Sequence, residues 1–188
     1  IYVHVPSAWL SLFIYMNMAA AGAISLIWKM KVADAFARAA APLGASFTFL
    51  ALVTGSLWGQ PMWGTYWVWD ARLTSELILL FLYLGYIALQ NAIEDPRAAA
   101  RAGAILAIVG SVNVPIIHYS VEWWNTLHQG PTVSKFDAPS IHWTMLVPLL
   151  AMTGAFMAFF GSVALKRSQS ELIAMEPRSK WVRERFSP

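Results

Sequence analysis

Five long apolar stretches, separated by short polar segments, dominate the pattern of this chain. They cover residues 8–28, 42–58, 77–90, 102–117 and 143–165, and each is nearly free of charge. A helix needs roughly 17 to 25 residues to cross a hydrocarbon core about 30 Å thick, so the third and fourth stretches reach that length only with flanking residues. The pattern predicts an all-α integral membrane protein, a bundle of five transmembrane helices.

Polar and proline residues predict where these helices begin and end. Ser7 is expected to N-cap the first helix, and Pro42 to lie in the first turn of the second. Asp70 is expected to cap the third helix. Pro115 lies near the outer end of the fourth, where a carbonyl freed by proline is readily hydrated.

The connection after the fourth stretch has its own periodicity. In residues 119–130, Val121, Trp124 and Leu127 recur at intervals of three. This spacing predicts a short amphipathic helix lying at the membrane interface. Such a helix would turn three side chains toward the connection 58–75, the first outer loop: Trp123, Trp124 and His128.

Composition supports the membrane assignment. The 188 residues are 58% hydrophobic and 12% charged, and the charged share is about half that of a soluble domain. Cysteine is absent, so thiolate ligands are excluded and any metal is held by His, Met or carboxylate. The chain starts at Ile1 without Met or a charged leader, so we expect a further N-terminal portion.

Basic residues are distributed unevenly between the two sides of the predicted bundle. Of the thirteen Lys and Arg residues, only Arg72 and Lys135 fall on the side of the connections 58–75 and 118–142. The remaining eleven lie on the other side: Lys29, Lys31, Arg38, Arg97, Arg101, Lys166, Arg167, Arg178, Lys180, Arg183 and Arg185. The positive-inside rule places the tail 166–188 in the cytoplasm. The net charge of +3 therefore reflects topology, and nucleic-acid binding is not implied.

The connection 58–75 is unusually rich in tryptophan, with four of the ten tryptophans within twelve residues: Trp58, Trp63, Trp67 and Trp69. An interfacial belt would explain tryptophans at helix ends. Here Gly59, Pro61 and Gly64 interrupt the segment, so we expect Trp63 and its neighbours to lie inside a loop. A concave aromatic shelf for a flat, conjugated ligand explains that placement better.

All four histidines fall on this same outer side. His4 precedes the first helix and His128 lies in the second outer connection, so the two can flank the shelf without entering hydrocarbon. A pair of imidazoles from opposite sides can hold a haem iron axially. His118 is expected to form hydrogen bonds within the bundle, with direct ligation as the alternative, and His142 to be an interface residue.

Few acidic or basic side chains lie on the outer side. Asp70 and Arg72 can form an ion pair, or Asp70 can cap the third helix while Arg72 binds a ligand's carboxylates bidentately. Glu76 and Glu122 are costly to bury, so each is expected to have a partner, with a structural or a functional role equally open.

The motif that runs from Trp63 to Thr74, WGTYWVWDARLT, resembles the tryptophan-rich "WWD" signature of haem-handling proteins in cytochrome c biogenesis. The flanking stretches VHVP (residues 3–6) and HYSVEWWNTLHQG (residues 118–130) are similar to the smallest member group, the cytochrome c maturation protein C family (CcmC). The similarity covers nearly all of residues 1–165. Tyr66 takes a position where another Trp would be accepted.

The resemblance implies a haem b site on the periplasmic face of a bacterial inner membrane, with His4 and His128 as axial ligands. The other residues expected at the site are Trp58, Trp63, Trp67, Trp69, Asp70, Arg72, Trp123 and Trp124. Implied partners are a periplasmic haem chaperone (CcmE-like), a small single-span subunit (CcmD-like) and a two-component ABC transporter (CcmA- and CcmB-like). Members have six transmembrane helices, so a first helix would precede the five predicted here.

The function implied is the loading of haem onto the chaperone during c-type cytochrome maturation. The chain contains no obvious nucleophile of its own, so it would position the cofactor while the partner's histidine forms the covalent bond. Two alternatives remain open: a haem-translocating permease, or a direct cytochrome c haem synthase of the same WWD superfamily. A single membrane domain, 1–188, is expected in each case.

Overall fold

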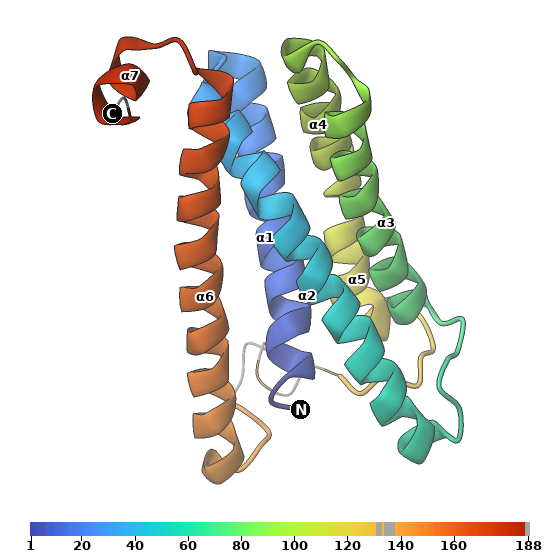
Figure 1. The fold of residues 1–188 in the computed structure, drawn as a ribbon. Helices are drawn as coiled ribbons and strands as arrows, with labels where there is room; N and C mark the ends of the chain where they lie inside the picture. The colour runs from blue at the N-terminus through green and yellow to red at the C-terminus, as the bar shows by residue number, and fades with distance from the viewer. Residues whose placement is uncertain (131–132, 134–137, 187–188) are drawn as a thin grey trace.

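A computed structural model describes residues 1–130, 133 and 138–186, and within these ranges the chain is helical and contains no strand (Figure 1). The helices are α1 (His4–Trp28), α2 (Lys31–Trp63), α3 (Ala71–Ala92), α4 (Pro96–Gly110), α5 (Asn113–Trp123), α6 (Trp143–Met175) and α7 (Lys180–Phe186). Five runs in the described part are long and apolar enough to cross a membrane, with α4 and α5 counted as one run. This confirms the predicted all-α membrane fold.

Two predicted helix starts are wrong, because both helices begin earlier. α1 begins at His4, and Ser7, the expected cap, is completely buried inside it. α2 begins at Lys31, so Pro42 lies within the helix. The segment before Pro42 is rich in alanine, which favours a helix, and most of these alanines are buried. Packing therefore extends α2 beyond the apolar stretch.

The break between α4 and α5 has a local cause. Pro115 lacks an N–H, and its ring conflicts with the carbonyl four residues earlier, at Ser111. Ser111 and Val112 accordingly separate the two helices. The predicted helix over 119–130 is only partly correct, since α5 ends at Trp123 and the backbone turns extended at Trp124.

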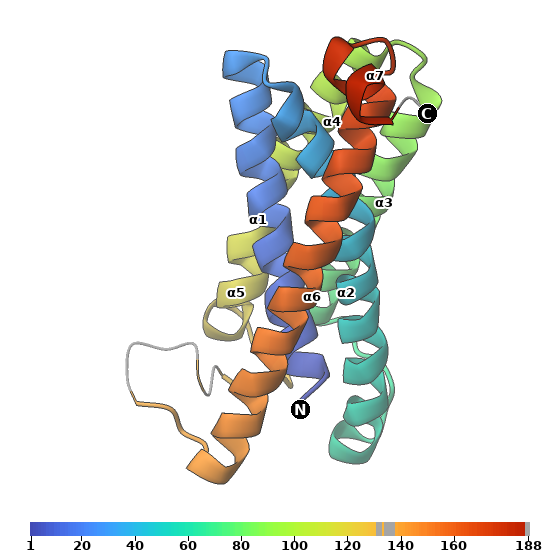
Figure 2. The same ribbon diagram turned by 60° about the vertical axis from the view of Figure 1, so that its left-hand side comes forward.

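The core lies between α1 and the helices around it. Leu10, Ile14 and Met18 of α1 are almost completely shielded, and the Tyr15 and Tyr83 rings meet edge to face at 5.0 Å. Figure 1 shows α1 and α2 crossing at the centre, with α3 to α5 on one side and α6 on the other, and Figure 2 shows α6 in front, between α1 and α2. This packing brings the first turn of α1 beside the outer half of α2.

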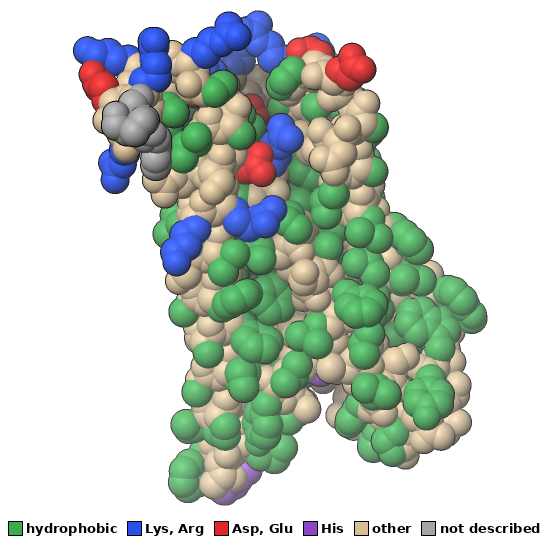
Figure 3. Space-filling model, viewed as in Figure 1, with side chains coloured by type: hydrophobic (Ala, Val, Ile, Leu, Met, Phe, Trp, Pro, Cys, Tyr) green, Lys and Arg blue, Asp and Glu red, His purple; other side chains and the backbone are tan. Residues whose placement is uncertain are grey.

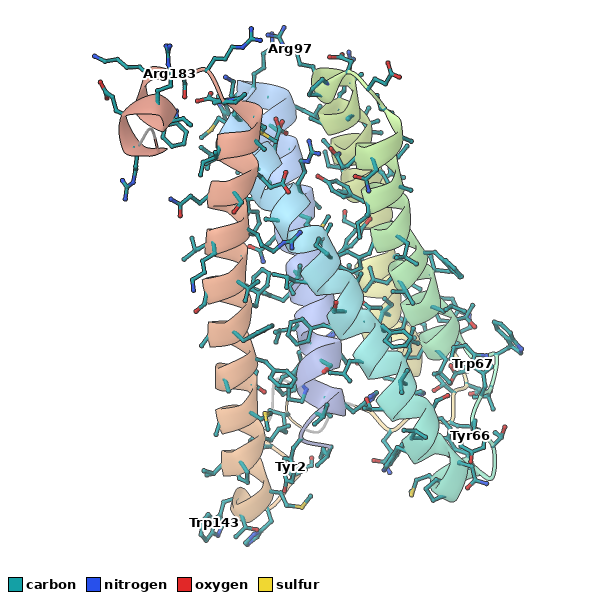
Figure 4. The ribbon with its side chains drawn as sticks, viewed as in Figure 1. Tyr2, Tyr66, Trp67, Arg97, Trp143 and Arg183 are labelled. Atoms are coloured by element: carbon teal, nitrogen blue, oxygen red, sulfur yellow. The ribbon has the colours of Figure 1, made fainter. Side chains whose placement is uncertain are left out.

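The two ends of the bundle differ in chemistry. Lys and Arg side chains gather at the end that carries α7 and the C-terminus (Figure 3), where Lys31 and Arg38 of α2 pair with Glu176 and Glu171 of α6. Tyr2, Tyr66, Trp67 and Trp143 lie at the opposite end (Figure 4). α6 extends to Met175, so the first part of the predicted tail 166–188 is helical. Lys135 lies outside the described residues.

Candidate functional site

The tryptophan-rich segment is partly helix and partly loop. α2 continues through Trp63 and ends at Gly64, whose φ of 76° is the left-handed conformation that glycine adopts without strain. The expectation that Trp63 lies inside a loop is therefore wrong, and Gly59 and Pro61 belong to the helix. The Trp58 and Trp63 rings meet at 5.6 Å on the last turns of α2, and those of Trp67 and Trp69 meet at 5.4 Å on the loop. The four tryptophans therefore form two ring pairs, one at the end of α2 and one on the loop that follows it.

His4 projects from the first turn of α1 toward α2. Its Nδ1 lies 2.9 Å from the Ala51 carbonyl oxygen and 3.2 Å from Thr54 Oγ1. A carbonyl can only accept, so Nδ1 carries the proton and donates to Ala51. The neutral ring then has its lone pair on Nε2, the atom with which histidine binds a metal when Nδ1 is held by the backbone.

Gly55 leaves the space that the His4 ring occupies. A Cβ at this position would lie 2.8 Å from His4 Cε1, closer than such atoms approach in folded proteins. The close approach of α2 to the imidazole therefore depends on the missing side chain.

We expect Gly55→Ala to displace the His4 ring. At the haem site that the resemblance implies, this would weaken haem binding by about tenfold, the lower end of the effect of removing a group that orients a metal ligand. Helix stability should not fall, because alanine is the better helix former. Haem titration of the purified variant measures the effect. Gly154→Ala is the matched control, since that helical glycine has nothing within 4 Å of its added Cβ; equal affinities for the two variants would contradict the prediction.

His128 lies against the first outer connection and the end of α2. Its Nδ1 lies 3.4 Å from Asp70 Oδ2, and its ring lies 4.8 Å from that of Trp63. The Asp70 carboxylate is well placed, because its other oxygen accepts from Leu73 N at 2.8 Å and caps α3, as the sequence predicts. An ionised carboxylate only accepts, so His128 Nδ1 donates and Nε2 is again the free nitrogen.

Electrostatics keep His128 uncharged at neutral pH. Burial lowers its pKa below the usual 6.5, and the positive charge of Arg72 lowers it further, while Asp70 opposes both effects. The lowered value means that the neutral imidazole, which is the form that binds iron, persists to lower pH than in free histidine.

The positive charge of Arg72 acts on both His4 and His128. In the part of the chain that the structure describes, its guanidinium makes no ion pair or hydrogen bond, although Asp70 and Glu76 are near enough to interact. The expected Asp70–Arg72 ion pair is therefore not formed. A half-buried, unpaired guanidinium is a ready partner for a carboxylate of a ligand.

The remaining predicted residues lie farther out. The Trp123 ring stacks on that of Tyr119, with the ring centroids 5.4 Å apart, and its centroid lies 5.8 Å from that of Trp124. Both tryptophans are exposed. Of the three side chains expected to face the first loop, the structure brings only His128 into contact with it. Residues 125–127 and 68–70 line a cleft of about 320 Å³ beside Asp70.

The other two histidines do not join this site. His118 is exposed on α5, against the Tyr119 ring, and is not the bundle residue that the sequence suggested. His142 caps α6 by accepting from Thr144 N. Glu122 is exposed, so the cost that its burial would carry does not arise.

The residues present fit a haem better than a bare metal ion. Among the described residues, no group of three or more His, Asp or Glu side chains is placed to hold a metal. A porphyrin supplies four ligands itself and needs from the protein only axial nitrogens, apolar walls and partners for its propionates. His4 and His128, the tryptophans and Arg72 offer these groups.

The sequence over residues 1–183 matches the profile of the family described as "Heme exporter protein C" (CcmC). The chain belongs to this family. It is 55% identical to the "Heme exporter protein C" of Escherichia coli (strain K12) over 184 residues, 98% of this chain and 74% of that protein. The Bradyrhizobium diazoefficiens protein of the same name is 52% identical over 178 residues, which cover 95% of this chain and 68% of that protein.

A mitochondrial protein of Marchantia polymorpha, whose name includes "cytochrome c biosynthesis ccmC-like", is 48% identical over 161 residues, 86% of this chain and 68% of that protein. Membership confirms the predicted family and connects the chain with haem handling in cytochrome c maturation.

Several groups at the site were missed from the sequence. Gly55, Ala51 and Thr54 looked like ordinary positions of an apolar helix, and only their contact with His4 marks them. Asp70 was identified as a cap but not as the acceptor for His128. The predicted cap was itself a signal, because one carboxylate oxygen can cap a helix while the other accepts from an imidazole.

Proposed function

We propose that this protein binds haem b at the periplasmic face of the bacterial inner membrane and loads it onto a periplasmic, CcmE-like chaperone. The observation that carries the proposal is the shared state of the two histidines. Among the described residues, His4 and His128 each have Nδ1 held by the protein and Nε2 without a partner, and Arg72 makes no ion pair or hydrogen bond. This arrangement suits two axial ligands and a propionate contact.

Each residue of the site has a defined part in the proposal. His4 and His128 bind the iron, and the Trp58, Trp63, Trp67 and Trp69 rings supply apolar and aromatic contact to the macrocycle. Arg72 meets a propionate, and Trp123 and Trp124 extend the aromatic surface toward the second outer loop. A vinyl edge would be left accessible, so that the chain would contribute the proximity and orientation of the haem to the chaperone's histidine.

The orientation rests on charge. The end rich in Lys and Arg is placed in the cytoplasm, with the C-terminus, and the aromatic end in the periplasm. The partners proposed beside the chaperone are a CcmD-like single-span subunit and the CcmA- and CcmB-like transporter, which drives release of the loaded chaperone.

The haem-translocating permease is less well supported, because three of the polar side chains inside the helices already donate to backbone carbonyls. Thr48 and Thr54 donate to carbonyls of their own helix, and Asn113 donates to the Ser75 carbonyl. A permease needs polar groups that line a path across the membrane. The direct synthase is less well supported, because the family model that matches residues 1–183 is described as heme exporter protein C.

Haem delivery with and without this chain tests the proposal. The chaperone is expressed in the periplasm of cells that contain or lack the full-length protein, and covalent haem on the chaperone and total periplasmic haem are both measured. Loading predicts loss of the covalent adduct with periplasmic haem retained. Loss of both would favour the permease, and an adduct that forms without this chain would overturn the proposal.

A further inference from the structure

A polar contact deep between α1 and α3 lies just below the candidate site. Glu76 of α3 has only 8% of its surface exposed, and its Oε1 lies 2.8 Å from Ser11 Oγ of α1. Tyr83 Oη adds a second bond between these helices by donating to the Ser11 carbonyl oxygen at 2.7 Å. None of these residues binds iron in the proposed function.

The hydrogen-bond count at Ser11 indicates the protonation state of Glu76. Ser11 Oγ lies 2.7 Å from the Ala8 carbonyl oxygen as well as 2.8 Å from Glu76 Oε1. One hydroxyl has one hydrogen, and a carbonyl can only accept. Both contacts are hydrogen bonds when Ser11 donates to Ala8 and the carboxylic acid of Glu76 donates to Ser11.

The surroundings of Glu76 agree with an uncharged acid. An unpaired carboxylate in a membrane-spanning helix is costly to bury. Arg72 lies one turn away on the same helix and is near enough to interact, yet within the described ranges the two form no ion pair. A neutral Glu76 leaves the Arg72 charge available.

The contact also connects the elements that carry the site. α1 presents His4 two turns before Ser11, and α3 presents Asp70 and Arg72 less than two turns before Glu76. Because α-helices are stiff over two turns, the Ser11–Glu76 bond limits how far His4 can move relative to the other two residues.

We propose that Glu76 is a positioning residue of the haem site: as an uncharged acid it holds α1 to α3 through Ser11 and leaves Arg72 free to bind a carboxylate of the ligand. This inference rests on the proposed haem function. Glu76 acts through His4 and Arg72, so its replacement changes the geometry of the bound haem and not only the stability of the fold.

Haem titration and spin-state spectroscopy of four variants of the full-length protein test the inference. Glu76→Gln should bind haem like wild type with an unchanged low-spin spectrum, because the amide is uncharged and can still donate to Ser11. Glu76→Leu and Ser11→Ala should each lose about tenfold in affinity and show a high-spin fraction, as when a partner that orients a ligand is removed. Ser120→Ala is the matched control for Ser11→Ala, since Ser120 is also completely buried and its Oγ donates to the carbonyl three residues earlier, at 2.8 Å.

The outcomes separate this inference from the proposed function. A Gln variant that behaves like the Leu variant would show that the charge of Glu76 matters. It would overturn the assignment of Glu76 as an uncharged acid. Leu and Ala variants with wild-type affinity and spectrum would overturn the positioning role while leaving the haem site intact. If Glu76→Leu fails to fold, Ser11→Ala still decides. A wild-type protein that binds no haem would overturn both proposals.

Discussion

Replacing either His4 or His128 by alanine is expected to abolish the low-spin haem spectrum. Each histidine has only Nε2 free, and six-coordinate iron needs one such nitrogen on each face. Loss of one ligand leaves five-coordinate, high-spin iron, and loss of both leaves only aromatic and propionate contacts. Visible absorption spectra of the detergent-purified, full-length variants measure the change, and covalent haem on the chaperone should be lost with it.

Exogenous imidazole provides a further test of the two axial positions. Added to His4→Ala or His128→Ala, it should occupy the vacated space and restore the low-spin bands, because the rest of the site is unchanged. His118→Ala and His142→Ala are the controls, since the first ring is exposed on α5 and the second caps α6. An unchanged spectrum in His4→Ala or His128→Ala, with loss in one of the controls, would move the ligands to those residues.

Asp70→Asn is expected to reduce haem binding nearly as much as His128→Ala does, although it removes only a hydrogen-bond acceptor. Asparagine is as good an N-cap as aspartate, so α3 keeps its cap, worth about 1 kcal/mol. With the amide oxygen at the cap, the amide NH₂ faces His128 Nδ1, and two donors then oppose each other. The imidazole is driven to the tautomer with its proton on Nε2, which cannot bind iron. We expect at least a tenfold loss of haem affinity, as for removal of the partner of a ligating histidine.

The pH dependence separates this tautomer effect from simple protonation of His128. Asp70 is the group that raises the pKa of His128, so its replacement lowers that pKa further and keeps the ring neutral. Raising the pH should therefore not restore haem binding to Asp70→Asn. Asp95→Asn is the matched control, because Asp95 caps α4 by accepting from Arg97 N and Ala98 N and holds no histidine. Recovery at high pH, or an equal loss in the control, would contradict the prediction.

The helices show how much of the fold an apolar pattern predicts. All five spans were identified, because a membrane helix must be apolar over most of its length. Their ends were less accurate: α2 starts at Lys31 and not at Pro42, and α6 runs past the apolar stretch to Met175. The Lys31–Glu176 and Arg38–Glu171 ion pairs join those two extensions, a contact across 145 and 133 positions that no local pattern contains.

The sequence by itself determined the class of fold, the charge asymmetry between the two ends, the cap at Asp70 and the residue types of the site. These properties follow from the composition of single segments or from neighbours within one turn. The tertiary structure alone decided which nitrogen of each histidine is free, that Arg72 has no partner among the described residues, and that Glu76 meets Ser11. The deciding contacts join residues 47, 58 and 65 positions apart. The first and the third are closed by the packing of α1 against α2 and α3, and the second by the packing of α5 against α3.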